Sequence, residues 1–72
     1  MKTTVLFRDP NNHPVIELRK MGYFTGFDMY RQRPDNPAKM FFVRSFLGRD
    51  EAGTYVKEHP ELIAGAAVMA HG

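Results

Sequence analysis

Cysteine is absent from this chain of 72 residues, so no disulfide or thiolate metal site is available to it. Long apolar runs are absent too, since none approaches the roughly 18 residues of a membrane-spanning helix. The apolar patch after Lys2 ends at Arg8 and is too short for the hydrophobic region of a signal peptide. These absences predict a cytoplasmic protein with no membrane association.

A chain this short predicts a single domain, residues 1–72, with a thin margin of stability. Folding of such a domain buries only about 60% of the surface that the unfolded chain exposes. Small domains compensate with disulfides, metals, oligomers or partners. Without cysteine, the remaining sources of stability are close packing, a homodimer or a bound partner.

Recognisable catalytic patterns are also missing. The three histidines, His13, His59 and His71, have no spacing that favours a shared metal ion. Ser45 is the only serine and lacks a Gly-x-Ser-x-Gly context. No glycine-rich phosphate loop occurs in the sequence. We therefore expect a non-enzymatic protein with no catalytic residue, no metal site and no cofactor.

Turn-forming residues divide the first part of the chain, residues 1–47, into strand-like segments. These segments are 3–8, 15–21, 23–32 and 38–47. The turns at 9–14 and 33–37 are rich in Pro, Asn and Asp, which favour turn conformations. Gly22 and Gly26 leave two alternatives for residues 23–32, a bent continuation of the second strand or a separate third strand.

The rest of the chain, residues 48–72, is predicted to be helical. Asp50 is the predicted N-cap, and Pro60 predicts a break because proline lacks an N–H and suits the first position of a new helix. Residues 61–71 then predict a short apolar helix. Strands followed by helices indicate the α+β class, here a small antiparallel meander of three to four strands followed by a kinked or broken C-terminal helical segment packed on one face.

Aromatic and basic residues concentrate between Gly22 and Phe46, a segment that holds seven of the nine aromatic rings. From Arg49 onward acidic residues dominate instead. Strict alternation places Met40, Phe42, Arg44 and Phe46 on one face of the last strand, and Phe41, Val43, Ser45 and Leu47 on the other. Rings on both faces indicate a sheet that curls around its core, a face covered by a second protomer, or a face that binds a partner.

A binding surface is the function that this segment predicts. The candidate binding residues are Tyr23, Phe24, Tyr30, Arg31, Arg33, Phe42, Arg44 and Phe46. Because Tyr and Arg are enriched at interface hot spots, we expect a protein partner bound at the open sheet face or an edge strand. The alternative partner is nucleic acid, whose bases stack on exposed rings while Arg and Lys hold the phosphates. A homodimer is a third arrangement that the same rings allow.

One segment, YVKEHPELIAGA at residues 55–66, resembles helical segments of plasmid mobilisation and primase proteins, in which a Pro-Glu-Leu start precedes an Ala-rich helix. The resemblance covers about a sixth of the chain and implies no site residue. It implies an origin in a mobile element, a phage or a plasmid. The accessory proteins of such elements include small inhibitors of host defence, the anti-CRISPR-like proteins, whose size this chain matches.

Overall fold

The computed structural model describes residues 2–20, 26–63 and 69–70. Its elements, in chain order, are β1 (Lys2–Arg8), β2 (Pro14–Lys20), β3 (Phe27–Arg33), β4 (Asn36–Phe46), α1 (Arg49–Glu58), the 3-10 turn η1 (Pro60–Leu62) and β5 (Met69–Ala70). The antiparallel sheet followed by a helix confirms the predicted α+β class.

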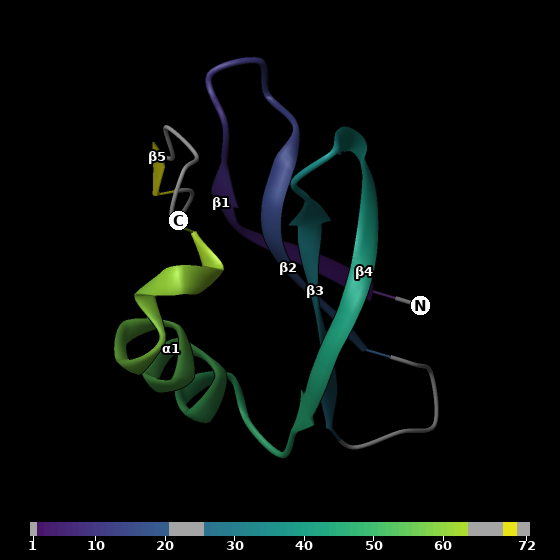
Figure 1. The fold of residues 1–72 in the computed structure, drawn as a ribbon. Coiled ribbons are helices and arrows are strands. Elements are labelled where there is room, and N and C mark those ends of the chain that lie inside the picture. Colours follow the sequence, from purple (N-terminus) through teal and green to yellow (C-terminus); the bar gives the residue numbers. More distant parts are fainter. Residues whose placement is uncertain (1, 21–25, 64–68, 71–72) are drawn as a thin grey trace.

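The first four strands form a meander, because the spatial order of the sheet is β4-β3-β2-β1-β5. Figure 1 shows these strands side by side, with α1 to one side of them. The β1–β2 turn includes Asn12 at a φ of 68°, a left-handed conformation that asparagine tolerates. β3 pairs antiparallel with β2, so it is a separate third strand and not a bent continuation of the second. Residues 21–25, between these strands, lie outside the described residues.

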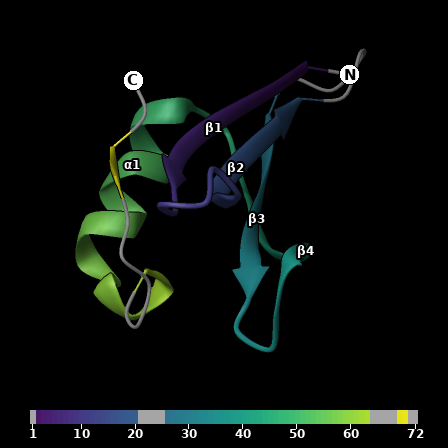
Figure 2. The same cartoon turned by 90° about the horizontal axis from the view of Figure 1, so that it is seen from above.

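The core lies between the sheet and α1, which covers one face of the sheet (Figure 2). Its buried apolar residues are Val15, Ile16, Leu18, Met29, Phe46, Ala52, Val56 and Leu62. Residues directly opposite in neighbouring strands share a face, so Ile16 and Leu18 face the helix together with Met29. We call this face the helix side and the other the open face. β2 is buried on both faces, since Glu17 on the open face is also buried.

The start of α1 differs from the predicted one. Gly48, not Asp50, precedes the first helical residue, and no side-chain hydrogen bond caps the helix. The backbone N–H of Ala52 donates to the carbonyl oxygen of Gly48, which makes Gly48 the cap position. Asp50 and Glu51 lie in the first turn instead, where the helix dipole favours acidic side chains.

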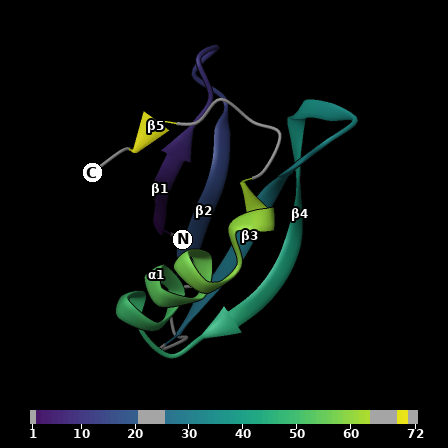
Figure 3. The ribbon, with the colours of Figure 1, turned by 60° about the vertical axis from the view of Figure 1, so that its left-hand side comes forward.

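The predicted break at Pro60 is confirmed, but the apolar helix predicted after it is wrong where the structure describes it. α1 ends at Glu58, and Pro60 begins η1 at the position where a missing N–H costs nothing. Met69 and Ala70 form β5, beside β1 in Figure 3, and pair with Arg8 and Phe7 of that strand. The free backbone groups of the β1 edge override the local helix propensity there. Residues 64–68 and 71–72, which include His71, lie outside the described residues.

Leu62 provides a test of how η1 closes the core. Its side chain is buried at 7% exposure among the other core residues, so Leu62→Ala should lower the free energy of unfolding by roughly 2–5 kcal/mol. The neighbouring Glu61 is exposed, and Glu61→Ala should change it by less than about 0.5 kcal/mol. Urea unfolding measures both variants. Equal losses in the two would contradict the assignment of Leu62 to the core.

Candidate binding surface on the open face of the sheet

The rings of Tyr30 and Phe42 form a pair on the open face. They are cross-strand partners in the β3–β4 ladder, so their side chains leave the sheet on the same side. The ring centroids are 5.8 Å apart and the planes meet at 71°, the edge-to-face arrangement that aromatic quadrupoles favour. Phe42 keeps 52% of its surface exposed. Part of this aromatic pair is therefore open to contact.

An ion pair on β2 contacts the Tyr30 ring on the side away from Phe42. The guanidinium carbon of Arg19 lies 3.8 Å from the centroid of the Tyr30 ring. Arg19 Nε also donates a hydrogen bond to Glu17 Oε1 at 2.7 Å, and Arg19 Nη2 lies 2.6 Å from the same oxygen in an ion pair. The Glu17 side chain is only 8% exposed, so its charge is largely removed from water and depends on this partner. We call Glu17, Arg19, Tyr30 and Phe42 the open-face cluster.

A bulge in β4 decides which predicted residues join this cluster. Met29 is opposite Arg44 and Tyr30 is opposite Phe42, which leaves Val43 as an extra residue in β4. The bulge reverses the alternation, so Arg44 lies on the helix side although Phe42 lies on the open face. The predicted single face of Met40, Phe42, Arg44 and Phe46 is therefore wrong. A second register shift lies between Gln32 and Arg33, next to the β3–β4 turn.

Two of the predicted binding residues, Arg44 and Phe46, lie where the sheet meets α1. Phe46 is a core residue at 8% exposure and contacts Tyr55 edge to face, with ring centroids 5.3 Å apart. The guanidinium carbon of Arg44 lies 5.3 Å from the Phe46 ring centroid and 5.1 Å from that of Tyr55. The Tyr55 ring in turn stacks on His59 at 4.0 Å. Phe46 therefore belongs to the core, and Arg44 extends over the same sheet–helix contact.

The remaining predicted residues occupy other places. Arg31 is on the helix side, with its guanidinium carbon 5.4 Å from the ring centroid of Phe41, its partner in β4. Arg33 forms an exposed ion pair with Asp35 in the β3–β4 turn, and the hydrogen bond from Arg33 lowers the pKa of the Asp35 carboxyl. Tyr23 and Phe24 lie outside the described residues. Of the eight predicted residues, only Tyr30 and Phe42 are shown together on the open face.

The binding residues predicted from the sequence did not include Glu17 and Arg19, the two charged members of the cluster. Alternation along β2 does place Glu17 and Arg19 on one face, opposite Ile16 and Leu18, and this pattern was the available signal. What alternation does not reveal is that Tyr30 lies directly across from Glu17. That register brings the Arg19 guanidinium over the Tyr30 ring and turns four separate residues into one cluster.

Hydrogen bonds to the Asp9 carboxylate connect the β1–β2 turn to β3, beside the open-face cluster. Asp9 Oδ1 accepts hydrogen bonds from the backbone N–H groups of Asn11 and His13, each at 2.9 Å. Its other oxygen, Oδ2, accepts from Nε2 of Gln32 in β3, also at 2.9 Å. The Gln32 hydrogen bond, followed by those of the backbone, lowers the pKa of the Asp9 carboxyl below its ordinary value of 3.8.

Among residues 2–20, 26–63 and 69–70, no three His, Asp or Glu side chains are grouped in a way that could hold a metal. None of the helices in that part of the chain is long and apolar enough to cross a membrane.

The open-face cluster offers three groups for contact: a half-exposed Phe42 ring, the Tyr30 ring beside it, and the Arg19 guanidinium stacked on Tyr30.

Asp9 should make stability depend on acid pH. A carboxyl whose pKa is lower in the folded state contributes stability above the unfolded pKa of 3.8, and this contribution is lost as the pH falls through the folded pKa. In Asp9→Asn this loss should disappear, so stability should fall less steeply below that pH than in the unaltered chain. Urea unfolding across the acid range measures the slope. Glu51→Gln, which removes an exposed helical carboxylate, is the control, and an unchanged slope in Asp9→Asn would contradict the assignment.

Arg19 should matter to stability through Glu17. Arg19→Leu leaves the buried carboxylate without its partner and should cost about 3 kcal/mol, the usual scale for breaking a buried ion pair. The double variant Glu17→Leu with Arg19→Leu removes both charges and should recover most of that loss. A double-mutant cycle by urea unfolding gives the coupling between the two side chains. Additive losses would mean that the ion pair does not hold Glu17 in place.

Comparisons of the chain with protein-family models, with curated proteins and with solved structures found no match. The features of the molecule that bear on function are therefore the open-face cluster and the exposed side chains of β4.

Proposed function

We propose that this is a non-enzymatic binding protein that recognises another protein through the open-face cluster and the adjoining strand β4. One observation carries the proposal. The large apolar side chains that stay exposed among the described residues all lie on β4 or directly after it: Phe41 at 41%, Phe42 at 52% and Leu47 at 79%. Exposed apolar groups gathered along one edge of a small domain are typical of interaction sites.

The geometry of Tyr30 supports an anchoring role. Its ring contacts the Arg19 guanidinium on the β2 side and forms an edge-to-face pair with Phe42 on the β4 side. A side chain that is already ordered loses little conformational freedom when a partner covers it, so more of the contact energy appears as affinity. Tyrosine and arginine are also the residue types most enriched at interface hot spots.

The charges favour a protein partner over nucleic acid. Phosphate binding needs cations that are free to replace the counterions of the backbone. Arg19 is already paired with Glu17 and Arg33 with Asp35, so two of the basic groups near the rings are neutralised within the chain. Nucleic acid remains the alternative partner for the same rings. The resemblance of residues 55–66 favours a biological context in which a phage or plasmid encodes this protein as an accessory protein or an anti-CRISPR-like inhibitor of host defence.

Phe42 should separate binding from folding. Because half of its surface is exposed, Phe42→Ala should change the free energy of unfolding by about 1 kcal/mol or less. Loss of a hot-spot ring should weaken binding by about 2 kcal/mol, near thirtyfold in affinity. The partner is first captured from the native host with the tagged protein, with and without nuclease, and affinity is then measured by calorimetry.

Thr54→Ala, on the exposed side of α1, is the matched control and should bind like the unaltered chain. Salt dependence separates the two partner classes, since phosphate contacts give a steep loss of affinity with salt and a ring-anchored protein interface does not. Unchanged affinity in Phe42→Ala, or capture that nuclease abolishes, would contradict the proposal.

A further inference from the structure

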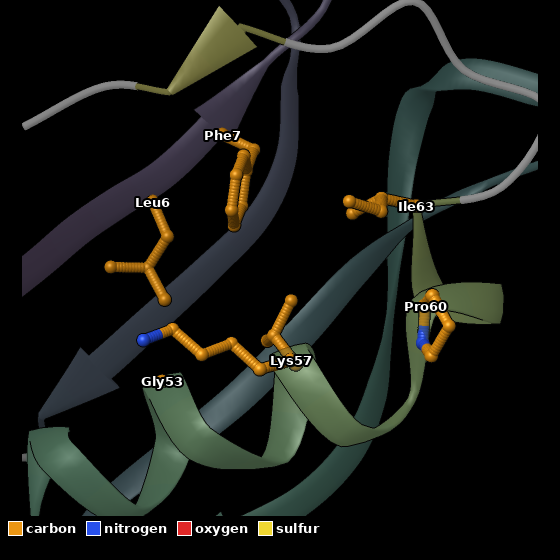
Figure 4. Close-up of a pocket in the computed structure, with 7 residues that line it drawn as sticks. Leu6, Phe7, Gly53, Lys57, Pro60 and Ile63 are labelled. Carbon is orange, nitrogen blue, oxygen red and sulfur yellow. The ribbon is translucent and has the colours of Figure 1, made fainter.

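A second concave site lies on the helix side, between β1 and α1. Figure 4 shows this groove, which has a volume of about 400 Å³. Its labelled lining residues are Leu6, Phe7, Gly53, Lys57, Pro60 and Ile63. The volume falls within the roughly 300–1,000 Å³ typical of small-molecule sites. The open-face cluster is on the other side of the sheet, so the two sites are separate.

An irregularity in β1 forms one wall of the groove. The β1–β2 register shifts between Val5 and Phe7, which leaves Leu6 as an extra residue in β1. Neighbouring side chains of a regular strand point to opposite faces, but a bulge relaxes that rule. Leu6 and Phe7 therefore both line the groove. On the outer edge of β1, β5 pairs with Phe7 and fixes this part of the strand.

Gly53 keeps the opposite wall open. It precedes Val56 and Lys57 by three and four residues, a spacing that puts these three on one face of α1, and all three line the groove together with Pro60 of η1. Glycine inside a helix is less stable than alanine, and a close approach of another backbone is its usual reason. Among the residues that the structure describes no such approach occurs, because a Cβ added at Gly53 would meet none of their atoms within 4 Å. The missing side chain leaves its space to the groove.

Among the described residues that line the groove, Lys57 alone is charged and the others are apolar. In Figure 4 its carbon stem runs along the helix, and its nitrogen lies at the end of the groove near Leu6 and Gly53. None of the ion pairs among the described residues involves Lys57. Apolar walls with a single cation at one end complement a molecule with an apolar chain and a negative head group.

We propose that this groove binds a medium-chain fatty acid. The acyl chain lies against Leu6, Phe7 and Ile63, and the carboxylate meets the Lys57 ammonium. The proposal does not depend on the protein-binding function, because it uses no residue of the open-face cluster.

The probes are octanoate, decanoate, decanol and decyltrimethylammonium, titrated below their micelle concentrations and followed by calorimetry and by amide chemical shifts. Two further buried methylenes should make decanoate bind roughly tenfold more tightly than octanoate. Decanol should bind about two- to fivefold more weakly than decanoate, the scale of an exposed ion pair, and the cationic probe more weakly still. The shifts should map to the residues that line the groove.

Gly53→Leu tests the site without loss of the fold. Its side chain enters open space and improves helix propensity, so the melting temperature should be kept or raised while decanoate affinity falls at least about tenfold. Thr54→Leu adds the same side chain one residue along, at an exposed position, and should bind decanoate normally. Lys57→Gln should lose about two- to fivefold for decanoate and nothing for decanol.

Three results would overturn the proposal. The first is unchanged decanoate affinity in a folded Gly53→Leu. The second is binding that appears only above the micelle concentration. The third is sedimentation that shows a dimer with the groove buried, in which case a second copy of the chain is the occupant. Phe42→Ala should bind decanoate like the unaltered chain, which keeps this test separate from that of the protein-binding surface.

Discussion

The burial of β2 on both faces is the constraint on which the other features depend. One short helix covers only one side of a sheet, and α1 does so over Ile16 and Leu18. The other side of β2 carries Glu17, a charge that needs a partner once water is removed. Arg19 supplies that partner, the Tyr30 ring lies against its guanidinium, and Phe42 packs on Tyr30. The Tyr30 ring thus serves the fold first, and the exposed part of Phe42 is open to the protein partner that we propose.

Irregularities in β4 and β1 determine which residues make up the open-face cluster and the groove. A regular β4 would place Phe42 and Arg44 on one face, where both would join a single aromatic and basic surface. The extra Val43 instead divides them between the open face and the contact with α1. The extra Leu6 in β1 adds a second side chain to the wall of the groove. In this small sheet, single-residue bulges determine which side chains meet.

Much of the fold could be predicted from the sequence because it follows from local chemistry. The turn residues separate the strands, the alternation of β2 places Glu17 and Arg19 together, and Pro60 ends α1 because it lacks an N–H. The division of the predicted binding residues could not be foreseen, since a bulge is a property of two paired strands and leaves no clear mark in one of them. The pairing of Met69 and Ala70 with β1 was missed for a related reason. Their local preference is helical, and only the distant edge of β1 makes a strand favourable.

The irregular ladder of β4 also has a consequence for solubility. β4 is one of the two edge strands of the sheet, and a long, regular edge strand is a template on which further chains can stack into aggregates. The register shifts at Val43 and beside Arg33 interrupt that template. Between these two shifts, Pro37 has no backbone N–H to donate, and Lys39 carries a charge that repels other copies of the chain. The chain can therefore keep exposed phenylalanines on its outermost strand without offering a continuous row of backbone hydrogen bonds to other copies of itself.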